Sequence, residues 1–318
     1  MKERYVFIDI LKGIAILMIV YGHIIPGSFS AMTKFISTFH IPLFFFVSGL
    51  LFNEGKYKNK FGTFVRERTK GLVVPFLFFS IIVAAGYYFV EDNYREFICN
   101  LLKNGWGGYA LWFVPVLLLA ELGYFPLSIV PPLYRLLLLV GMAVLSYLSS
   151  LFVGMAPYNM LLCFCGIWFY GIGNMARTHI KMVSSLDVKQ LGLITILGGV
   201  FSLIYLPFSS TLPDWFVNKI PSMIYYISPL FATVCLMCLS ILIERYLGKY
   251  IVGFFSTCGK QSFIILAFHQ IIVMIVGRYL PSKMTILIMI VSLTFLVWYI
   301  PKYLPWMLGK TNVNKSRS

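Results

Sequence analysis

Ten long apolar segments are the feature that most constrains how this chain can fold. Each has close to the roughly 20 residues that a helix needs to cross a hydrocarbon core of about 30 Å. Because 59% of the 318 residues are hydrophobic and only 12% are charged, against about 25% in a soluble domain, no long polar stretch is left for a separate soluble domain. The predicted spans cover residues 5–25, 36–53, 72–90, 110–128, 132–153, 158–175, 190–207, 222–243, 259–280 and 284–304.

We therefore predict an all-α, polytopic membrane protein with about ten transmembrane helices. A single transmembrane domain is expected over residues 1–308, and the polar tail at 309–318 is expected to be disordered. The first apolar segment has no small-residue cleavage site at its end. We therefore expect an uncleaved first span, which Pro26 and Gly27 terminate.

The lysines and arginines are distributed unevenly between the predicted loops. With the N-terminus in the cytoplasm, 19 of the 26 fall in cytoplasmic segments and six in external ones, while Lys12 lies inside the first span. This bias predicts that both termini are cytoplasmic. It also accounts for most of the net charge of +15, so no nucleic-acid partner is expected.

The first span carries three ionisable residues on one face. At 100° per residue, Lys12 and His23 lie about 20° apart on the helix, and Asp9 lies about 40° from His23. Charged groups are costly against lipid, so these residues are expected to face the bundle interior or a water-filled cavity. Asp9 and Lys12 are candidate catalytic residues, although, three residues apart, they can also simply pair with each other. The second span opens on His40, and the ninth places His269 near its middle, where a histidine can support the site or have a purely structural role.

A dense group of positive charges lies between the second and third spans. We call Arg66, Arg68 and Lys70 the basic cluster. Such cations bind phosphate groups well, although they also serve the positive-inside rule without any ligand. The third span is expected to begin after the cluster, near Gly71, with Pro75 in its first turn.

The fourth span contributes two further candidates. Glu121 is an intramembrane carboxylate, for which Lys12 or a histidine is the expected partner. Trp112 lies nine residues before it and is expected to anchor the outer membrane interface. Cys235 and Cys238 form a CxxC pattern, but no second pair or histidine cluster accompanies it, so no metal site is predicted.

Five stretches of sequence, taken in order, resemble a known family. They are IDILKGIAILMIVYGHI, FHIPLFFFVSGLLF, FVRERTKGLVVPFLFFS, ALWFVPVLLLAEL and FIILAFHQIIV. Together they resemble the membrane acyltransferase-3 family of bacterial carbohydrate O-acyltransferases, in its fucose 4-O-acetylase-like branch. The resemblance implies a protein of the bacterial cytoplasmic membrane that transfers a short acyl group, expected to be acetyl, from cytoplasmic acyl-CoA to a hydroxyl of an envelope glycan. It also implies the stand-alone type, without the extracytoplasmic hydrolase-like domain of many members.

The resemblance also assigns roles to individual residues. The essential histidine of the family corresponds to His23, and its basic pair corresponds to Arg66 and Arg68. The basic residue eleven positions before the histidine is commonly Arg in the family but is Lys12 here. Lysine keeps the charge and loses the bidentate fork of a guanidinium.

Acyl transfer from a thioester to an alcohol sets its own requirements. It needs a base for the hydroxyl, stabilisation of the oxyanion and a site for the CoA phosphates. His23 is the predicted base, and His40 is expected to share that work or to stabilise the oxyanion. The basic cluster is predicted to bind the phosphates. Since Lys12 and His23 are about 16 Å apart along a helix, we predict a channel between a cytoplasmic donor site and an external acceptor site.

Two other classes of function remain open at this point. Ten spans with buried charges also suit a transporter or flippase for a small anion or a lipid-linked sugar. Against it, the sequence has no repeated half and no matching pair of broken helices. A scaffold or sensor in polysaccharide assembly is the third class, which predicts that histidine variants keep their function.

Overall fold

The computed structural model describes residues 5–24, 31–89, 93–96, 99, 109–150, 162–204 and 223–310, and all regular structure within them is helical. The predicted disordered tail at 309–318 lies outside the described residues from position 311 onward. The helices are α1 (Val6–Ile24), α2 (Ala31–Leu51), α3 (Glu54–Tyr57), α4 (Phe61–Arg68), η1 (Thr69–Val73), α5 (Val74–Tyr87), η2 (Tyr109–Trp112), α7 (Phe113–Leu127), α8 (Pro132–Ser150), α9 (Leu162–Ala176), η4 (Arg177–His179), α10 (Ile180–Ser185), α11 (Val188–Ile204), η6 (Met223–Tyr226), α12 (Ser228–Tyr246), α13 (Lys249–Lys260), α14 (Ser262–Gly277), α15 (Ser282–Tyr303) and η7 (Pro305–Leu308).

Each of the ten predicted spans coincides with a helix, but not all of these helices are long enough to cross a membrane. Within the described residues, six helices have the required length and apolar character, and the bent pair α13–α14 meets the test as one unit. The apolar part of α2 and the whole of α11 are shorter. The protein is thus an all-helical, multi-pass membrane protein, and the count of ten remains a prediction. The six helices are Val6–Ile24, Phe61–Tyr87, Ala110–Leu127, Pro132–Ser150, Met223–Tyr246 and Ser282–Tyr303.

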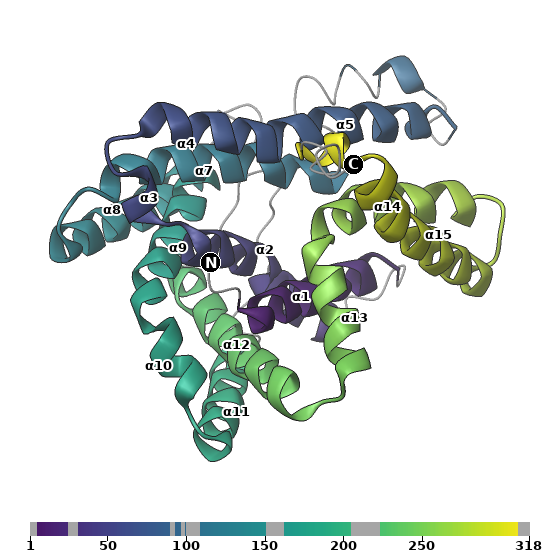
Figure 1. Cartoon of the computed structure of the whole chain (residues 1–318). Helices are drawn as coiled ribbons and strands as arrows, with labels where there is room; N and C mark the ends of the chain where they lie inside the picture. The colour runs from purple at the N-terminus through teal and green to yellow at the C-terminus, as the bar shows by residue number, and fades with distance from the viewer. Residues whose placement is uncertain are drawn as a thin grey trace, which may run out of the picture.

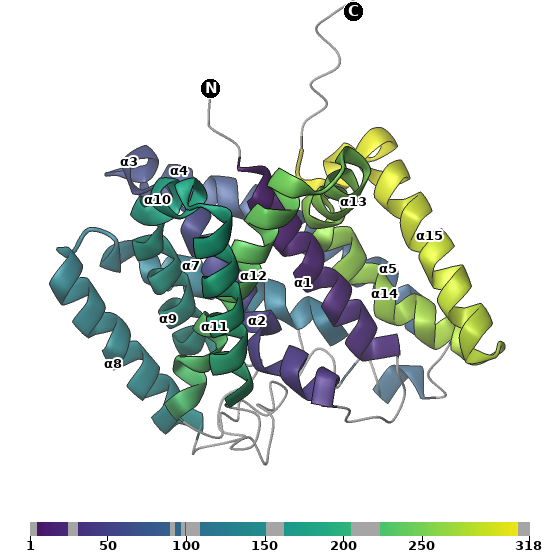
Figure 2. The same cartoon turned by 90° about the horizontal axis from the view of Figure 1, so that it is seen from below.

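The first helix lies at the centre of the bundle. Helix α1 packs against α2, α12, α13 and α14, whereas α8 and α15 lie at opposite outer edges (Figure 2). Figure 1 shows α4 and α5 crossing one side of the molecule in line with each other. The start of α1, the helices α3, α10 and α13, and η7 gather on one side (Figure 2). This arrangement agrees with two termini on one face of the membrane, while the identity of that face remains a prediction.

The predicted start of the third span near Gly71 is wrong. One continuous helix runs from Phe61 to Tyr87, and its residues Thr69–Val73 form a π-helical turn. Pro75 follows this turn directly. A proline inside an α-helix lacks the N–H for one hydrogen bond and its ring crowds the carbonyl four residues before it. The wider π turn accommodates both effects, so the helix continues through the proline.

The predicted ninth span is also different in the structure. The chain forms helix α13 over residues predicted to be a loop, bends by 78°, and continues as α14. Glycines bring α13 into backbone contact with α1. A Cβ atom added to Gly13 would lie 2.0 Å from the carbonyl oxygen of Phe255, and one added to Gly259 would lie 1.7 Å from that of Asp9. This crossing holds the bend beside the polar residues of the first span.

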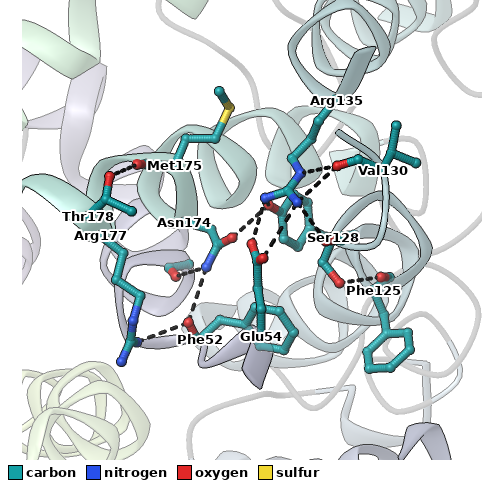
Figure 3. A network of polar contacts seen from close by, with 12 residues as sticks. Phe52, Glu54, Phe125, Ser128, Val130, Arg135, Asn174, Met175, Arg177 and Thr178 are labelled. Atoms are coloured by element: carbon teal, nitrogen blue, oxygen red, sulfur yellow. Dashed lines mark hydrogen bonds and ion pairs between the residues drawn. The ribbon is translucent and has the colours of Figure 1, made fainter. Parts of the chain in front are cut away.

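A second glycine crossing joins α2 to α9. A Cβ atom on Gly49 would lie 1.8 Å from the carbonyl oxygen of Tyr170, so only glycine fits there. Next to it, Asn174 donates hydrogen bonds to the carbonyls of Gly49 (3.2 Å) and Phe52 (3.1 Å), and Arg177 donates to Leu50 (3.2 Å) and Phe52 (2.9 Å). Figure 3 shows the bonds from Asn174 and Arg177 to Phe52. These bonds satisfy carbonyls that the last turn of α2 leaves without helical partners.

The same network extends to the loop between α7 and α8. Tyr124 donates to Asn174 at 2.8 Å, and Arg135 pairs with Glu54 at 2.5 Å. Arg135 also donates to the carbonyls of Ser128 (2.6 Å) and Val130 (3.0 Å) (Figure 3). Four helices are thereby fixed around one end of α2, the helix that carries His40.

Candidate active site

A cavity of about 440 Å³ lies inside the bundle, enclosed by α1, α2, η1, η2, α7 and α14. Its wall follows one face of α1 from Lys12 to His23, a distance of about 16 Å at 1.5 Å per residue. It also follows one face of α2 from Thr33 through His40 to Leu51. The predicted face of the first span therefore does border an internal space. Lys12 lies at one end of it and the two histidines at the other.

His23 contacts two residues of α14. The side-chain nitrogen of Gln270 lies 3.2 Å from its Nδ1 and 3.4 Å from its Nε2. The His269 ring lies beside it, with ring centroids 5.2 Å apart. The oxygen of the same Gln270 amide accepts a hydrogen bond from the backbone N–H of Ala110 at 2.9 Å. Because the oxygen is occupied in this way, the amide presents its N–H groups to His23.

Gln270 was missed by the sequence analysis. The signal that could have found it is a polar residue directly after His269 in an otherwise apolar run, FIILAFHQIIV. An uncharged amide in an apolar segment is a weaker indicator of a functional site than a charged residue is. Inside a membrane it nevertheless needs a hydrogen-bond partner. Gln270 lines the cavity together with His23.

His40 and His269 are both fixed by a hydrogen bond to their own helix. Nδ1 of His40 lies 2.8 Å from the carbonyl oxygen of Ile36, and Nδ1 of His269 lies 2.9 Å from that of Ile265. A carbonyl only accepts, so Nδ1 carries the proton, and Nε2 of each neutral ring carries the lone pair. His40 lines the cavity. His269 is fully buried and is not part of the cavity wall, so it supports His23 from behind.

Lys12 and Asp9 form an ion pair of 3.0 Å. The interpretation that they pair with each other is therefore confirmed. Lys12 lines the cavity, whereas Asp9 is buried outside the cavity wall. Asp9 thus neutralises and orients the ammonium group without reaching the cavity itself. Lys12, not Asp9, is the residue of this pair that a ligand in the cavity can contact.

The structure separates the members of the basic cluster. Arg68 points inward and pairs with Glu121, with 3.2 Å between Nε and Oε2. Arg66 and Lys70 are exposed, since they lie about 160–200° around the helix from Arg68. The predicted pairing of Glu121 with Lys12 or a histidine is wrong, because α4 packs against α7 and places the Arg68 guanidinium beside the carboxylate. None of the three cations of the cluster lines the cavity, although Leu72, two residues further along, does.

Trp112 is not at the lipid interface, where the sequence analysis expected it. Only 7% of the residue is exposed, and it lines the cavity beside Phe113. The 3₁₀ turn η2 accounts for this position, since the bond from Ala110 to Gln270 ties that turn to α14. The indole therefore forms part of the wall near His23 instead of facing lipid.

The fold and this site define a multi-pass membrane protein with a polar-ended cavity inside its helical bundle. The chain belongs to the acyltransferase-3 family, whose acyltransferase domain matches residues 5–302. It is also similar to the nodulation protein NolL of Sinorhizobium fredii (strain NBRC 101917 / NGR234), with 32% identity over 129 residues. That match covers 36% of this chain and 34% of the relative, so this chain spans about a third of the length of NolL. No solved structure gives a significant match.

Proposed function

We propose that this protein transfers a short acyl group, expected to be acetyl, from cytoplasmic acyl-CoA to a hydroxyl of a bacterial envelope glycan. Membership of the acyltransferase-3 family supports acyl transfer as the reaction. The observation that carries the rest is that one continuous cavity has Lys12, His23 and His40 in its wall. Such a cavity lets a donor from one side of the membrane and an acceptor from the other meet inside the bundle.

The end of the cavity at Lys12 suits the polar part of the donor. Besides the ammonium group, Ser48 and Ser262 line this end, and Ser262 is the first residue of α14. Free N–H groups in the first turn of a helix favour negative charge. The exposed Arg66 and Lys70 on the neighbouring helix attract the CoA phosphates from solution, which keeps part of the predicted role of the basic cluster.

The middle of the cavity is apolar, with Ile16, Phe44 and Leu266 among its lining residues. Burying charge among such side chains is unfavourable. The nucleotide of the donor therefore stays at the Lys12 end, and the uncharged pantetheine arm with its thioester extends toward the histidines. The required reach is about 16 Å.

The chemistry takes place between the two histidines of the cavity. The acceptor hydroxyl attacks the thioester carbonyl carbon, and its proton moves to an imidazole acting as general base. The tetrahedral oxyanion then collapses, the C–S bond breaks, and the CoA thiolate leaves with the proton that the imidazole had taken up. General-base assistance of this kind contributes about 10²- to 10⁴-fold to the rate.

The test is a comparison of envelope glycans from cells with and without the protein by mass spectrometry. We expect an acyl increment that disappears with the protein, and purified protein that releases CoA thiol from acetyl-CoA in the presence of those glycans. A transporter or flippase would neither bind acetyl-CoA nor release its thiol. Unchanged glycans together with absent thiol release would therefore refute the proposal.

A further inference from the structure

The two cavity histidines differ in the hydrogen bonds that set their tautomers. His40 donates from Nδ1 to the Ile36 carbonyl, so its Nε2 is a free acceptor. His23 has the opposite kind of neighbour, because the amide N–H of Gln270 points at it. The amide nitrogen lies 3.2 Å from Nδ1 and 3.4 Å from Nε2 of His23, so either ring nitrogen can accept from it. The ring nitrogen that accepts carries no proton, so the other ring nitrogen of neutral His23 carries the proton and is a donor.

We infer that Gln270 is a positioning residue that holds His23 as a hydrogen-bond donor, so that His40 is the general base and His23 stabilises the oxyanion. This assignment rests on the proposed function. It reverses the expectation from the sequence, which gave the base to His23. It follows from three contacts: Ala110 to Gln270, Gln270 to His23, and His40 to Ile36.

These two roles, general base for His40 and hydrogen-bond donor for His23, match what the attack on the thioester requires. In the attack, the hydroxyl proton moves to Nε2 of His40 as the new C–O bond forms. The negative charge that develops on the thioester oxygen accepts a hydrogen bond from the ring N–H of His23 that Gln270 leaves as a donor, and no proton is transferred there. A donor placed before the reaction begins is worth about 10²- to 10³-fold in rate. Collapse returns the proton from His40 to the departing thiolate.

The surrounding structure is built to keep the Gln270 amide in one orientation. Its oxygen is held by a backbone N–H, which a rotation of the amide would leave without its partner. His269 also packs against the His23 ring, and its own Nδ1 is occupied by Ile265. The His23 ring thus contacts an amide and a second imidazole that are both fixed in position.

Gln270→Glu is the decisive variant, because it changes one end of the amide and keeps the other. A carboxylate still accepts from Ala110, but it now accepts from His23 as well, which places the proton on the ring nitrogen that faces residue 270 and leaves the other ring nitrogen without one. We expect kcat to fall by about 100-fold with an unchanged KM for acetyl-CoA. The assay uses radiolabelled acetyl-CoA and envelope glycans from cells that lack the protein. If Gln270 only holds Ala110, the variant keeps wild-type kcat, and the inference is overturned.

A second pair of variants separates donor from base at the histidines themselves. Glutamine offers an N–H donor but cannot act as a general base. His23→Gln should therefore retain at least tenfold more activity than His23→Ala, whereas His40→Gln should be as inactive as His40→Ala. The opposite pattern would return the base to His23. Thermal unfolding in detergent identifies any variant that fails to fold, and His23→Gln still decides the matter if Gln270→Glu does not fold. An inactive wild-type protein in the same assay would instead refute the proposed function.

Discussion

Two ion pairs inside the bundle, Asp9–Lys12 and Arg68–Glu121, determine how their charged side chains are oriented. Glu121 is 2% exposed and Arg68 is its ion-pair partner in the described residues. The sequence identified both as candidates but could not pair them, since their distance depends on how α4 crosses α7. Lys12 and His23 were found because helical periodicity places them on one face of the first span, and His40 was found as a histidine at the start of the second span. The amide of Gln270 has no charge and therefore gave no comparable signal.

The Arg68–Glu121 pair leads to a stability prediction. Glu121→Gln leaves a guanidinium without its counter-charge, and we expect a loss of about 2 kcal/mol in the free energy of unfolding. This is less than the roughly 3–5 kcal/mol typical of fully buried pairs, because the side chain of Arg68 is 27% exposed. Unfolding in detergent measures the change. The double variant Arg68→Met, Glu121→Leu serves as the control and should regain most of the loss; equal instability of the two would contradict the explanation.

Lys12 leads to a prediction on donor binding. Lys12→Met removes the positive charge from the end of the cavity opposite the histidines, so the KM for acetyl-CoA should rise by about tenfold while kcat changes little. Lys12→Arg retains the charge beside Asp9 and should stay within a few-fold of wild type. Steady-state kinetics with both variants measures the effect. Equal KM values for Lys12→Met and wild type would remove Lys12 from the donor site.

At the scale of elements, the sequence located the helices well and their junctions poorly. All ten apolar segments coincide with helices because apolar length alone signals them. Helix α13 was taken for a loop because its twelve residues include charged ones at both ends and are too few to cross a membrane. Helix α13 is positioned by its backbone contact with α1 at Gly13 and Gly259. A tertiary contact of this kind gives no local pattern in the sequence from which it could be predicted.

That contact predicts a difference between two glycines of α13. Gly259→Ala places a methyl group where the Asp9 carbonyl oxygen lies, so α1 and α13 must separate, and the melting temperature and the acyl-transfer rate should both fall. Gly253→Ala on the same helix meets nothing within 4 Å. It should be neutral or slightly stabilising, by up to about 1 kcal/mol, since alanine is the better helix former. Similar behaviour of the two variants would show that the close approach is unimportant.

For the whole molecule, the orientation in the membrane is the main prediction that the charge distribution makes. The start of α1, the helix α13 and η7 lie on one side of the structure (Figure 2). The sequence assigns that side to the cytoplasm by its lysines and arginines. We therefore expect this side of the molecule to face the cytoplasm.

Two exposed tyrosines provide that experiment. Tyr250 lies in the first turn of α13 and is 82% exposed, and Tyr279 follows α14 and is 71% exposed. In a Cys99→Ser background, a membrane-impermeant maleimide should label Tyr279→Cys in intact cells, and Tyr250→Cys only after the cells are permeabilised. Labelling of Tyr250→Cys alone in intact cells would invert the topology, and with it the side from which the donor arrives.

The bend between α13 and α14 lets residues 259–270 contact both ends of α1. Before the bend, Gly259 touches the backbone of Asp9; nine residues after Gln261, Gln270 touches His23. If the helix continued straight through the 78° corner, Gln270 would be displaced by about 17 Å, given 1.5 Å per residue. A straight helix could contact α1 near Lys12 or reach His23 at the other end of the cavity. Only a helix bent at this position contacts both.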